Sequence, residues 1–507
     1  MSIFNLRCTT GALLLVSTSQ AAYADITAQD TWNDWKSYFS GVGYTVTATE
    51  TQAGDTLTVS DMIFTAPGSE EIGTMSMTLD QVSFRENGDG SVDVIFPEVS
   101  PIRIAAVDPD GGKVDISMEV RQSGMAATVS GEPTDMTSVY TARAVEMLLT
   151  EITVDDETLS TEDAAVRFVM EGLSGTSRTT LSDMRTYDQR MQANAVNYDV
   201  FFIDPEGGGS AEIDGKVDGI SFAGTSVLPL AVVDAGDMSG LLTAGLKVDG
   251  AFTFSGGSSN TKAVENGVET FAARTSSSGG TLNMLMGSDG LSYSAIQKDI
   301  KVAMTAQDIP VPVEFGMAEG AFNITMPLQK SEEMNDFAFG FSLSDFSMSD
   351  LLWGMFDPTA QLPRDPATVI LDLTGKARLL FDFLDPSAAV VSGDPNITPG
   401  EIGSVDINRL QITVAGAELT GDGAFTFDNS GPVGPPKPNG AVNLSLVGGN
   451  KLLDTLVGMG LLPEEQAMGA RMMMGMLAVP GNAPDTMNST IEINEQGHIM
   501  ANGQRIQ

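Results

Sequence analysis

Short runs of alternating apolar and polar residues, separated by glycine, aspartate and asparagine, recur through most of this sequence of 507 residues. Four examples are residues 91–96, 198–203, 338–343 and 369–373. Successive side chains of a β-strand point to opposite faces, so a period of two predicts strands with one buried and one exposed face. The sequence therefore predicts a mainly β fold, with either one elongated antiparallel sheet or two linked sheets.

One six-residue motif is repeated within the region predicted to be β-structure. Residues 249–254 and 422–427 both read DGAFTF, and residues 319–324 form a looser copy, EGAFNI. Each copy is predicted to be a tight turn that leads into a strand, with its phenylalanine and the residue two positions later on one face. The copies are unequally spaced, which argues against a regular solenoid and favours one extended sheet built from related hairpins.

The start of the chain after residue 24 predicts an amphipathic helix. Thr27 and Asp30 resemble a capping box in which aspartate replaces the usual glutamate, and Gly41 suits the end of the helix. Its apolar stripe, spaced i, i+3 and i+7, consists of Trp32, Trp35 and Phe39. Two interpretations are open: the stripe packs onto the sheet, or the helix plugs or lines one end of an apolar groove.

A second helical region is predicted near the C-terminus. Asn450 suits the N-cap of a helix over residues 451–457, and Pro463 suits the first position of another that runs to about Leu477. Two closing strands are then expected at residues 489–493 and 498–500. The second helix carries methionines at i, i+4 and i+8, namely Met468, Met472 and Met476. They could pack in the core, or they could form an adaptable surface for apolar ligands.

The domain organisation is predicted from two linker-like stretches. Residues 255–260 are rich in glycine and serine, and residues 431–438 contain clustered prolines that disfavour a central strand. We expect a helix and a β-rich region over residues 25–254, and a second β-rich region over residues 255–430. Residues 431–507 would then hold the proline-rich linker, the helical hairpin and the closing β-hairpin.

Residues 1–24 have the features of a removable secretory signal. Arg7 precedes the apolar stretch 11–16, and Ala22-Tyr23-Ala24 matches the small residues that signal peptidase recognises. Cleavage after Ala24 would place the mature chain in the periplasm, with secretion as the alternative. No later apolar segment approaches the length of about 20 residues that a spanning helix needs, so no transmembrane span is expected in the mature chain.

The catalytic inventory of the mature chain is poor. The only cysteine, Cys8, would leave with the signal, and His498 is the only histidine. Dedicated zinc or copper sites built on histidine and cysteine are therefore excluded, and no cofactor is expected. No Gly-x-Ser-x-Gly motif occurs, and His498 is expected to be an ordinary residue of a closing strand. We expect no catalytic residue and no metal site.

The acidic residues leave two further hypotheses open. A formal net charge of −41 disfavours nucleic acid and anionic lipid headgroups as partners. Residues 86–93 and 108–115 place oxygen ligands around glycines, as calcium loops do, although turns require the same residue types. A pair of carboxylates could also serve a glycan hydrolase.

Several short motifs resemble those of a known family. They are Asp357-Pro358, residues 362–366 with the strand that follows, residues 450–454 with 461–463, and residues 501–504. On these motifs the chain resembles, over most of its mature length, an exported alphaproteobacterial family known as a domain of unknown function (number twenty-one twenty-five). The resemblance implies no activity and no site residues. More loosely, the closing helices are similar to those of AsmA-like envelope proteins, whose long curved sheets hold an apolar groove.

The leading functional hypothesis is an exported, non-catalytic envelope protein. It would bind or pass an apolar, lipid-like molecule, or bind an envelope protein, along a groove of the sheet. The residues expected to contact this ligand are Trp32, Trp35, Phe39, Met468, Met472 and Met476. One alternative is a structural or adhesive acidic envelope protein that calcium could stabilise, and another is a carboxylate-dependent glycan hydrolase.

Overall fold

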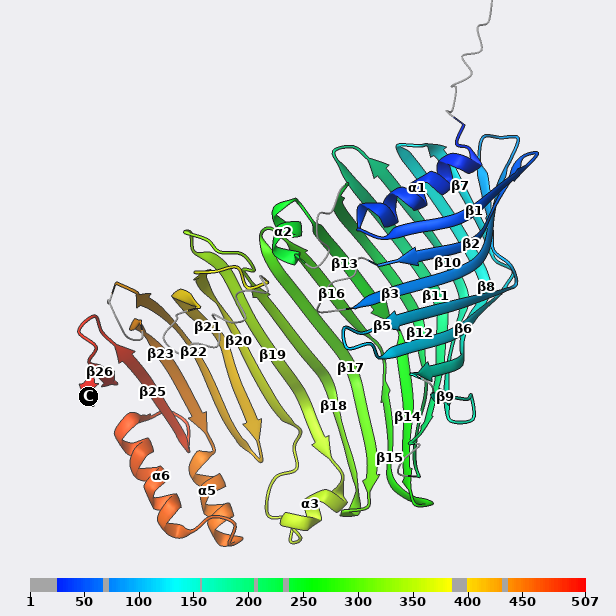
Figure 1. Cartoon of the computed structure of the whole chain (residues 1–507). Helices are drawn as coiled ribbons and strands as arrows, with labels where there is room; N and C mark the ends of the chain where they lie inside the picture. Colours follow the sequence, from blue (N-terminus) through cyan, green and yellow to red (C-terminus); the bar gives the residue numbers. More distant parts are fainter. Residues whose placement is uncertain are drawn as a thin grey trace, which may run out of the picture.

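The computed structural model describes residues 25–66, 73–155, 157–204, 208–230, 237–384, 399–430 and 436–507. Across these ranges the chain forms one antiparallel sheet of 27 strands, with a helix at its N-terminal end and two helices near its C-terminal end (Figure 1). The predicted mainly β fold is confirmed, as one sheet rather than two. The predicted signal segment, residues 1–24, lies outside the described residues.

The helices and strands follow one another along the chain as in Figure 1. The first part contains α1 (Ala28–Gly41), β1 (Thr45–Ala53), β2 (Thr56–Thr65), β3 (Thr74–Glu86), β4 (Val92–Ile95), β5 (Val99–Val107), β6 (Lys113–Ser123), β7 (Ala126–Glu132), β8 (Asp135–Val154) and β9 (Glu157–Leu159). The middle part contains β10 (Ala164–Leu181), β11 (Met184–Ile203), β12 (Gly209–Pro229), α2 (Met238–Thr243), β13 (Lys247–Phe254), β14 (Gly256–Glu265), β15 (Val268–Ser277), β16 (Gly280–Gly287), β17 (Gly290–Ala306), β18 (Ile309–Met326) and β19 (Asn335–Met348). The last part contains α3 (Asp350–Phe356), β20 (Ala367–Leu379), β21 (Gly400–Val414), β22 (Ala417–Asp428), β23 (Lys437–Val447), α5 (Gly449–Gly458), α6 (Glu464–Leu477), β24 (Val479–Pro480), β25 (Thr486–Ile493), β26 (Ile499–Ala501) and β27 (Gln504–Arg505).

Neighbouring strands pair without interruption from one end of the sheet to the other. Strands β8, β10, β11 and β12 pair in that order, and β17 to β23 pair in sequence order before β25 completes the row. Between them, β13 and β14 each pair with one part of β12, and β16 and β15 each pair with one part of β17. The sheet is therefore continuous across the middle of the chain.

The linker predicted at residues 255–260 is wrong. Residues 256–260 belong to β14, where Gly257 pairs with Val217 on one side and with Ser277 on the other. Small residues favour a flexible connection, but small polar residues are equally compatible with a strand whose two neighbours supply the backbone hydrogen bonds. The other predicted linker lies partly outside the described residues. Pro438 is the second residue of β23 and precedes the residues that pair with β25. The predicted division into domains stays a prediction.

The three copies of the repeated motif lie inside strands, so the predicted turns are wrong. Residues 249–254 lie in β13, residues 319–324 in β18 and residues 422–427 in β22. The glycine permits close approach of backbones: a Cβ atom at Gly423 would come within 2.5 Å of the Ala441 carbonyl oxygen. The predicted shared face is present, because the rings of Phe252 and Phe254 lie 6.3 Å apart.

A line of irregular positions crosses the strands and bends the sheet. Gly219 in β12, Asp299 in β17 and Asp345 in β19 have positive φ values of 58°, 47° and 54°. Such positions shift the alternation of side chains by one residue and increase the local twist of a strand. Ile300 consequently lines the same hollow as Ala295, five residues earlier. The inner row of side chains on β17 thus continues past Asp299 with Ile300.

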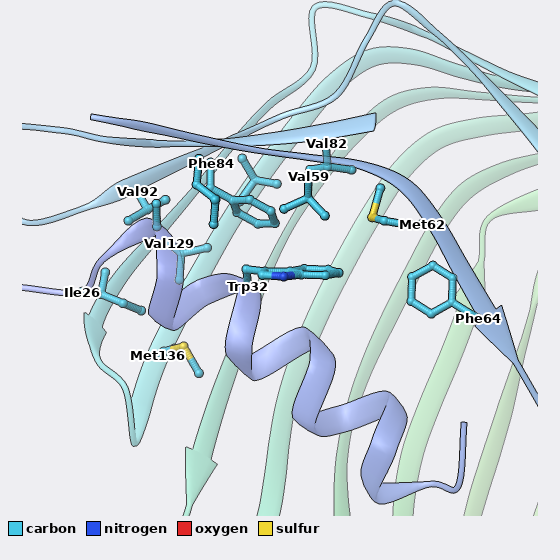
Figure 2. Packing of buried hydrophobic residues seen from close by; sticks show 13 residues of the cluster. Ile26, Trp32, Val59, Met62, Phe64, Val82, Phe84, Val92, Val129 and Met136 are labelled. Atoms are coloured by element: carbon cyan, nitrogen blue, oxygen red, sulfur yellow. The ribbon is translucent and has the colours of Figure 1, made fainter. Parts of the chain in front are cut away.

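Helix α1 forms where the capping box predicts it, and its stripe is docked on the sheet. The Asp30 N–H donates to Thr27 Oγ1, and the Thr27 N–H donates to Asp30 Oδ2, both at 3.1 Å. Trp32 is 0% exposed and lies against Val59, Val82 and Phe84 (Figure 2). The packing interpretation of Trp32, Trp35 and Phe39 is confirmed, since all three belong to the main hydrophobic core.

The sheet curls around α1, which contacts strands from two distant parts of the sequence. Strands β1 to β3 contact one side of the helix, and Glu50 of β1 accepts a hydrogen bond of 2.7 Å from Trp32 Nε1. On another side, Arg185 of β11 forms a buried ion pair of 2.6 Å with Asp34. The ion pair with Asp34 fixes α1 to this second part of the curled sheet, and Arg185 also donates to the hydroxyl of Tyr187 on the same strand at 3.0 Å.

The C-terminal helices form close to their predicted positions. Helix α5 begins at Gly449 with Gly448 at its N-cap, so Asn450 as the cap is wrong. The carboxylate of Asp485 instead accepts hydrogen bonds from the backbone N–H groups of Asn450 and Lys451, which satisfies the first turn from a distant loop. Asn502 and Gly503 form the two-residue turn between β26 and β27, with φ values of 48° and 79°.

Replacing Trp32 by alanine should lower the free energy of unfolding by about 3–5 kcal/mol, because it leaves a cavity in the main core. The control Met472→Ala, on an exposed side chain, should stay within about 0.5 kcal/mol of the wild type. Denaturant unfolding followed by circular dichroism measures both values. Equal stabilities of the two variants would contradict the docking of α1.

The pH dependence of stability should report the contact between β11 and α1. Burial raises the pKa of Tyr187 from its ordinary value of 10.0 to about 12. The folded chain therefore keeps this proton where the unfolded chain loses it, so stability should fall as pH rises from 10 to 12. The difference in unfolding free energy between the wild type and Tyr187→Phe, measured across this window, should shrink with rising pH. Parallel curves would contradict a buried phenol.

Candidate functional site

The candidate site is the face of the sheet that packs against α1, which we call the inner face. Residues that pair directly across antiparallel strands share a face, so this face can be followed from strand to strand. It leads from the core residue Met136 on β8 to β16 through the directly paired residues Thr179, Tyr187, Ser226, Val248 and Met286.

The inner face is apolar over β13 to β21. One row of directly paired residues consists of Phe252, Leu282, Ala295, Phe322, Phe341, Leu371 and Leu410. The neighbouring row on the opposite, outer face consists of Ala251, Asn283, Ser294, Asn323, Gly340, Asp372 and Arg409. The sheet therefore has one apolar and one polar face, as the period of two predicted.

The apolar inner face is largely uncovered in the described part of the chain. Among the described hydrophobic residues of strands β13 to β23, only Ala417 is buried. Leu282 and Phe341 are 36% and 42% exposed. Helix α2 covers one small patch, where Leu242 packs near Val248 and Met286. An apolar sheet face normally packs against a second layer, and a large exposed apolar surface marks a site of interaction.

A hollow of about 440 Å³ lies on the inner face near its middle. Strands β13, β16, β17, β18 and β19 form it, and its floor includes two copies of the repeated motif. Its apolar side chains include Phe252, Phe254, Leu282, Phe322, Phe341 and Leu343. The hollow can hold apolar groups. Its described lining residues do not include a cluster of charged side chains that could serve in catalysis.

Aromatic rings lie across glycines of neighbouring strands on this face. A Cβ atom at Gly280 would come within 2.8 Å of the Phe254 ring, and one at Gly375 within 2.6 Å of the Phe337 ring. The rings shield these glycine backbones and replace the missing side-chain contacts. This arrangement explains why strands so rich in glycine remain ordered. It also means that aromatic rings lying over the glycines line the groove.

The structure does not bring the predicted contact residues together. Trp32, Trp35 and Phe39 lie in the core at the closed end of the sheet, where α1 closes the curled part. Met468, Met472 and Met476 lie on α6, which contacts β25 and α5, and are 64%, 68% and 62% exposed. The core-packing interpretation of these methionines is wrong. No inner-face residue of β13 to β21 was predicted as a contact, although the repeated motif held the signal.

The predicted turn loops use their carboxylates internally. Asp108 accepts a hydrogen bond from the Gly112 N–H at 2.8 Å, and Asp89 accepts one from the Ser91 hydroxyl at 2.7 Å. These bonds fit the interpretation of residues 86–93 and 108–115 as turns. Within the described ranges, no cluster of three or more histidine, cysteine, aspartate or glutamate side chains is placed to hold a metal ion.

His498 precedes β26 rather than lying within it, and its N–H donates to Asn494 Oδ1 at 3.0 Å. None of the helices that the structure describes has both the length and the hydropathy needed to cross a membrane.

The fold and the inner face define a β-protein built on one curled sheet with an uncovered apolar face. Residues 252–498 match DUF2125, a family of uncharacterized proteins conserved in bacteria. The match is shorter than the resemblance predicted and leaves out α1 with its core. No curated protein matches the chain.

The residues that carry the family resemblance fix loops at the edges of the sheet. The buried carboxylate of Asp357 accepts the N–H groups of Gln361 and Leu362, both at 2.9 Å. Arg364 stacks on Trp353 of α3 and pairs with Asp350. Asn502 exchanges hydrogen bonds with Thr490 and so covers the edge of β25. These roles are structural.

Gly375→Ala should destabilise the fold by about 1–3 kcal/mol, because the added methyl group would overlap the Phe337 ring and the Ser404 carbonyl. The matched control is Gly354→Ala in α3, where a Cβ atom meets nothing within 4 Å. The control should leave stability unchanged or raise it by up to about 1 kcal/mol. Urea unfolding of both variants measures the difference, and an unchanged Gly375→Ala variant would refute the close approach.

Proposed function

We propose that this protein is an exported, non-catalytic envelope protein that holds or passes an apolar, lipid-like molecule along the inner face. One observation carries the proposal: a continuous apolar face that spans many strands and lacks a covering layer. Burying exposed apolar surface is favourable at roughly 25 cal/mol per Å², so an apolar ligand would complete the missing layer. The sparse catalytic inventory supports a binding role.

The size of the inner face suits an acyl chain. The row from Phe252 to Leu410 spans six steps between strands of about 4.8 Å each, or roughly 29 Å. One leaflet of a bilayer has a hydrocarbon depth of about 15 Å, half of the full core. An acyl chain could therefore lie across several strands, and its headgroup could remain in water.

The shape of the sheet supports exchange of the ligand at one end. Helix α1 closes the curled end, where Arg185 and Glu50 fix it to strands on two sides. Towards β20 to β23 the inner face continues with no buried strand residue larger than alanine. A ligand would thus enter and leave from the part of the sheet that matches the family. The adhesive and hydrolase hypotheses have no comparable arrangement of described residues in their favour.

The test is native mass spectrometry and lipid extraction of the protein purified gently from its own cells. We expect a co-purifying lipid mass and an apolar fluorescent probe that added lipid displaces. The variant Leu282→Gln/Phe341→Gln places two amides on the inner face and should weaken probe binding by about tenfold or more. The control Val139→Gln/Ile63→Gln changes two exposed apolar residues of the N-terminal part, away from the hollow, and should bind normally.

Circular dichroism would verify that both double variants fold. A protein that carries no lipid and binds no probe that lipids displace would refute the proposal. A protein mass that co-purifies and depends on Leu282 and Phe341 would instead support an envelope protein as the partner on the same face.

A further inference from the structure

Exposed apolar side chains gather on two helices at one edge of the sheet. Helix α3 follows β19, and the hairpin of α5 and α6 follows β23. Strands β19 to β23 pair antiparallel in sequence order, so β19 and β23 run in the same direction. Both helical segments therefore lie at the same edge, as Figure 1 shows at its lower margin.

Each helix presents an apolar stripe to the outside. On α6, Met468, Met472 and Met476 are more exposed than any inner-face residue named above, and Met473 beside them is 57% exposed. On α3, Leu351 and Met355 are 51% and 59% exposed. Residues four positions apart in a helix share a face, so each set forms a continuous stripe. The stripes lie outside the inner face and are not needed to line it.

The charge of this edge differs from that of the whole chain. Helix α6 begins with two exposed acidic residues, Glu464 and Glu465, but the rest of the helix, residues 466–477, carries one charged side chain, Arg471, which pairs with Asp454. The charged residue within α3, Asp350, pairs with Arg364. The full chain has a net charge of −41 and is repelled by anionic surfaces. The uncharged stripes therefore suit contact with zwitterionic headgroups better than the acidic remainder of the chain does.

We propose that the stripes of α3 and α6 dock this edge of the sheet on a zwitterionic phospholipid bilayer. A row of flexible thioethers needs no partner of matching shape when it enters the boundary between headgroups and acyl chains. The low charge of the stripes avoids the cost of taking ions out of water. Docking would place the edge that adjoins the inner face on the bilayer, and the bilayer is a source of apolar molecules. The contact itself does not depend on a ligand in the groove.

Flotation of the full mature chain with phosphatidylcholine vesicles tests the proposal. We expect the wild type to float with the vesicles, and to float less with vesicles that contain anionic phosphatidylglycerol. The affinity of the variant Met468→Ser/Met472→Ser/Met476→Ser for phosphatidylcholine vesicles should be at least about tenfold lower than that of the wild type. The matched control Met468→Leu/Met472→Leu/Met476→Leu keeps the apolar area and should float like the wild type. All three side chains are exposed, and circular dichroism would verify that both variants fold.

Equal flotation of the serine and wild-type proteins would overturn the proposal. So would a wild-type dimer, measured by analytical ultracentrifugation without vesicles, that the serine variant loses, because the stripe would then be an interface between copies. Docking on the bilayer and ligand binding on the inner face can fail separately. The serine variant should still carry lipid in native mass spectrometry, and Leu282→Gln/Phe341→Gln should still float.

Discussion

Backbone pairing between antiparallel strands is the constraint on which the rest of this structure depends. Most strands are held by two neighbours in the sheet, and much of the apolar surface has no second layer to pack against. The buried hydrophobic core is concentrated around Trp32, with a smaller cluster around Leu242. Because the ladder satisfies the backbone N–H and C=O groups of each strand internally, the sheet can extend beyond the core that anchors it.

Glycine and aromatic residues make this single sheet both thin and curved. Rings such as that of Phe337 lie across neighbouring glycines, so the inner face gains apolar contacts without side chains that project far from the sheet. Residues with positive φ, such as Asp299 and Asp345, bend the strands and shift their side-chain alternation. Curvature then allows distant strands to meet α1 from two sides, through Glu50 and Arg185.

Three surfaces of different character result from one arrangement of strands. The outer face carries polar side chains, the inner face carries aromatic and aliphatic ones, and the edge that holds α3 and α6 carries uncharged, exposed methionines. Both proposed contacts use apolar surface that the described chain leaves open. They differ in geometry, since the inner face contains a hollow, whereas the stripes are exposed side chains on helices. This difference suits a single molecule in one case and a deformable surface in the other.

Features that depend on neighbours along the chain could be predicted from the sequence. The period of two predicted the strands, Thr27 and Asp30 predicted the start of α1, and the repeated motif predicted that Phe252 and Phe254 share a face. Which surfaces are covered depends on contacts between distant parts of the chain, and local patterns could not predict it. Gly257 lies in a strand because β12 and β15 pair with it, Asp485 caps α5 from a distant loop, and Met472 is exposed because no strand lies over it. Local patterns fix the alternation of side chains, whereas burial depends on which distant strands and helices meet, and this is set by pairing across the whole sheet.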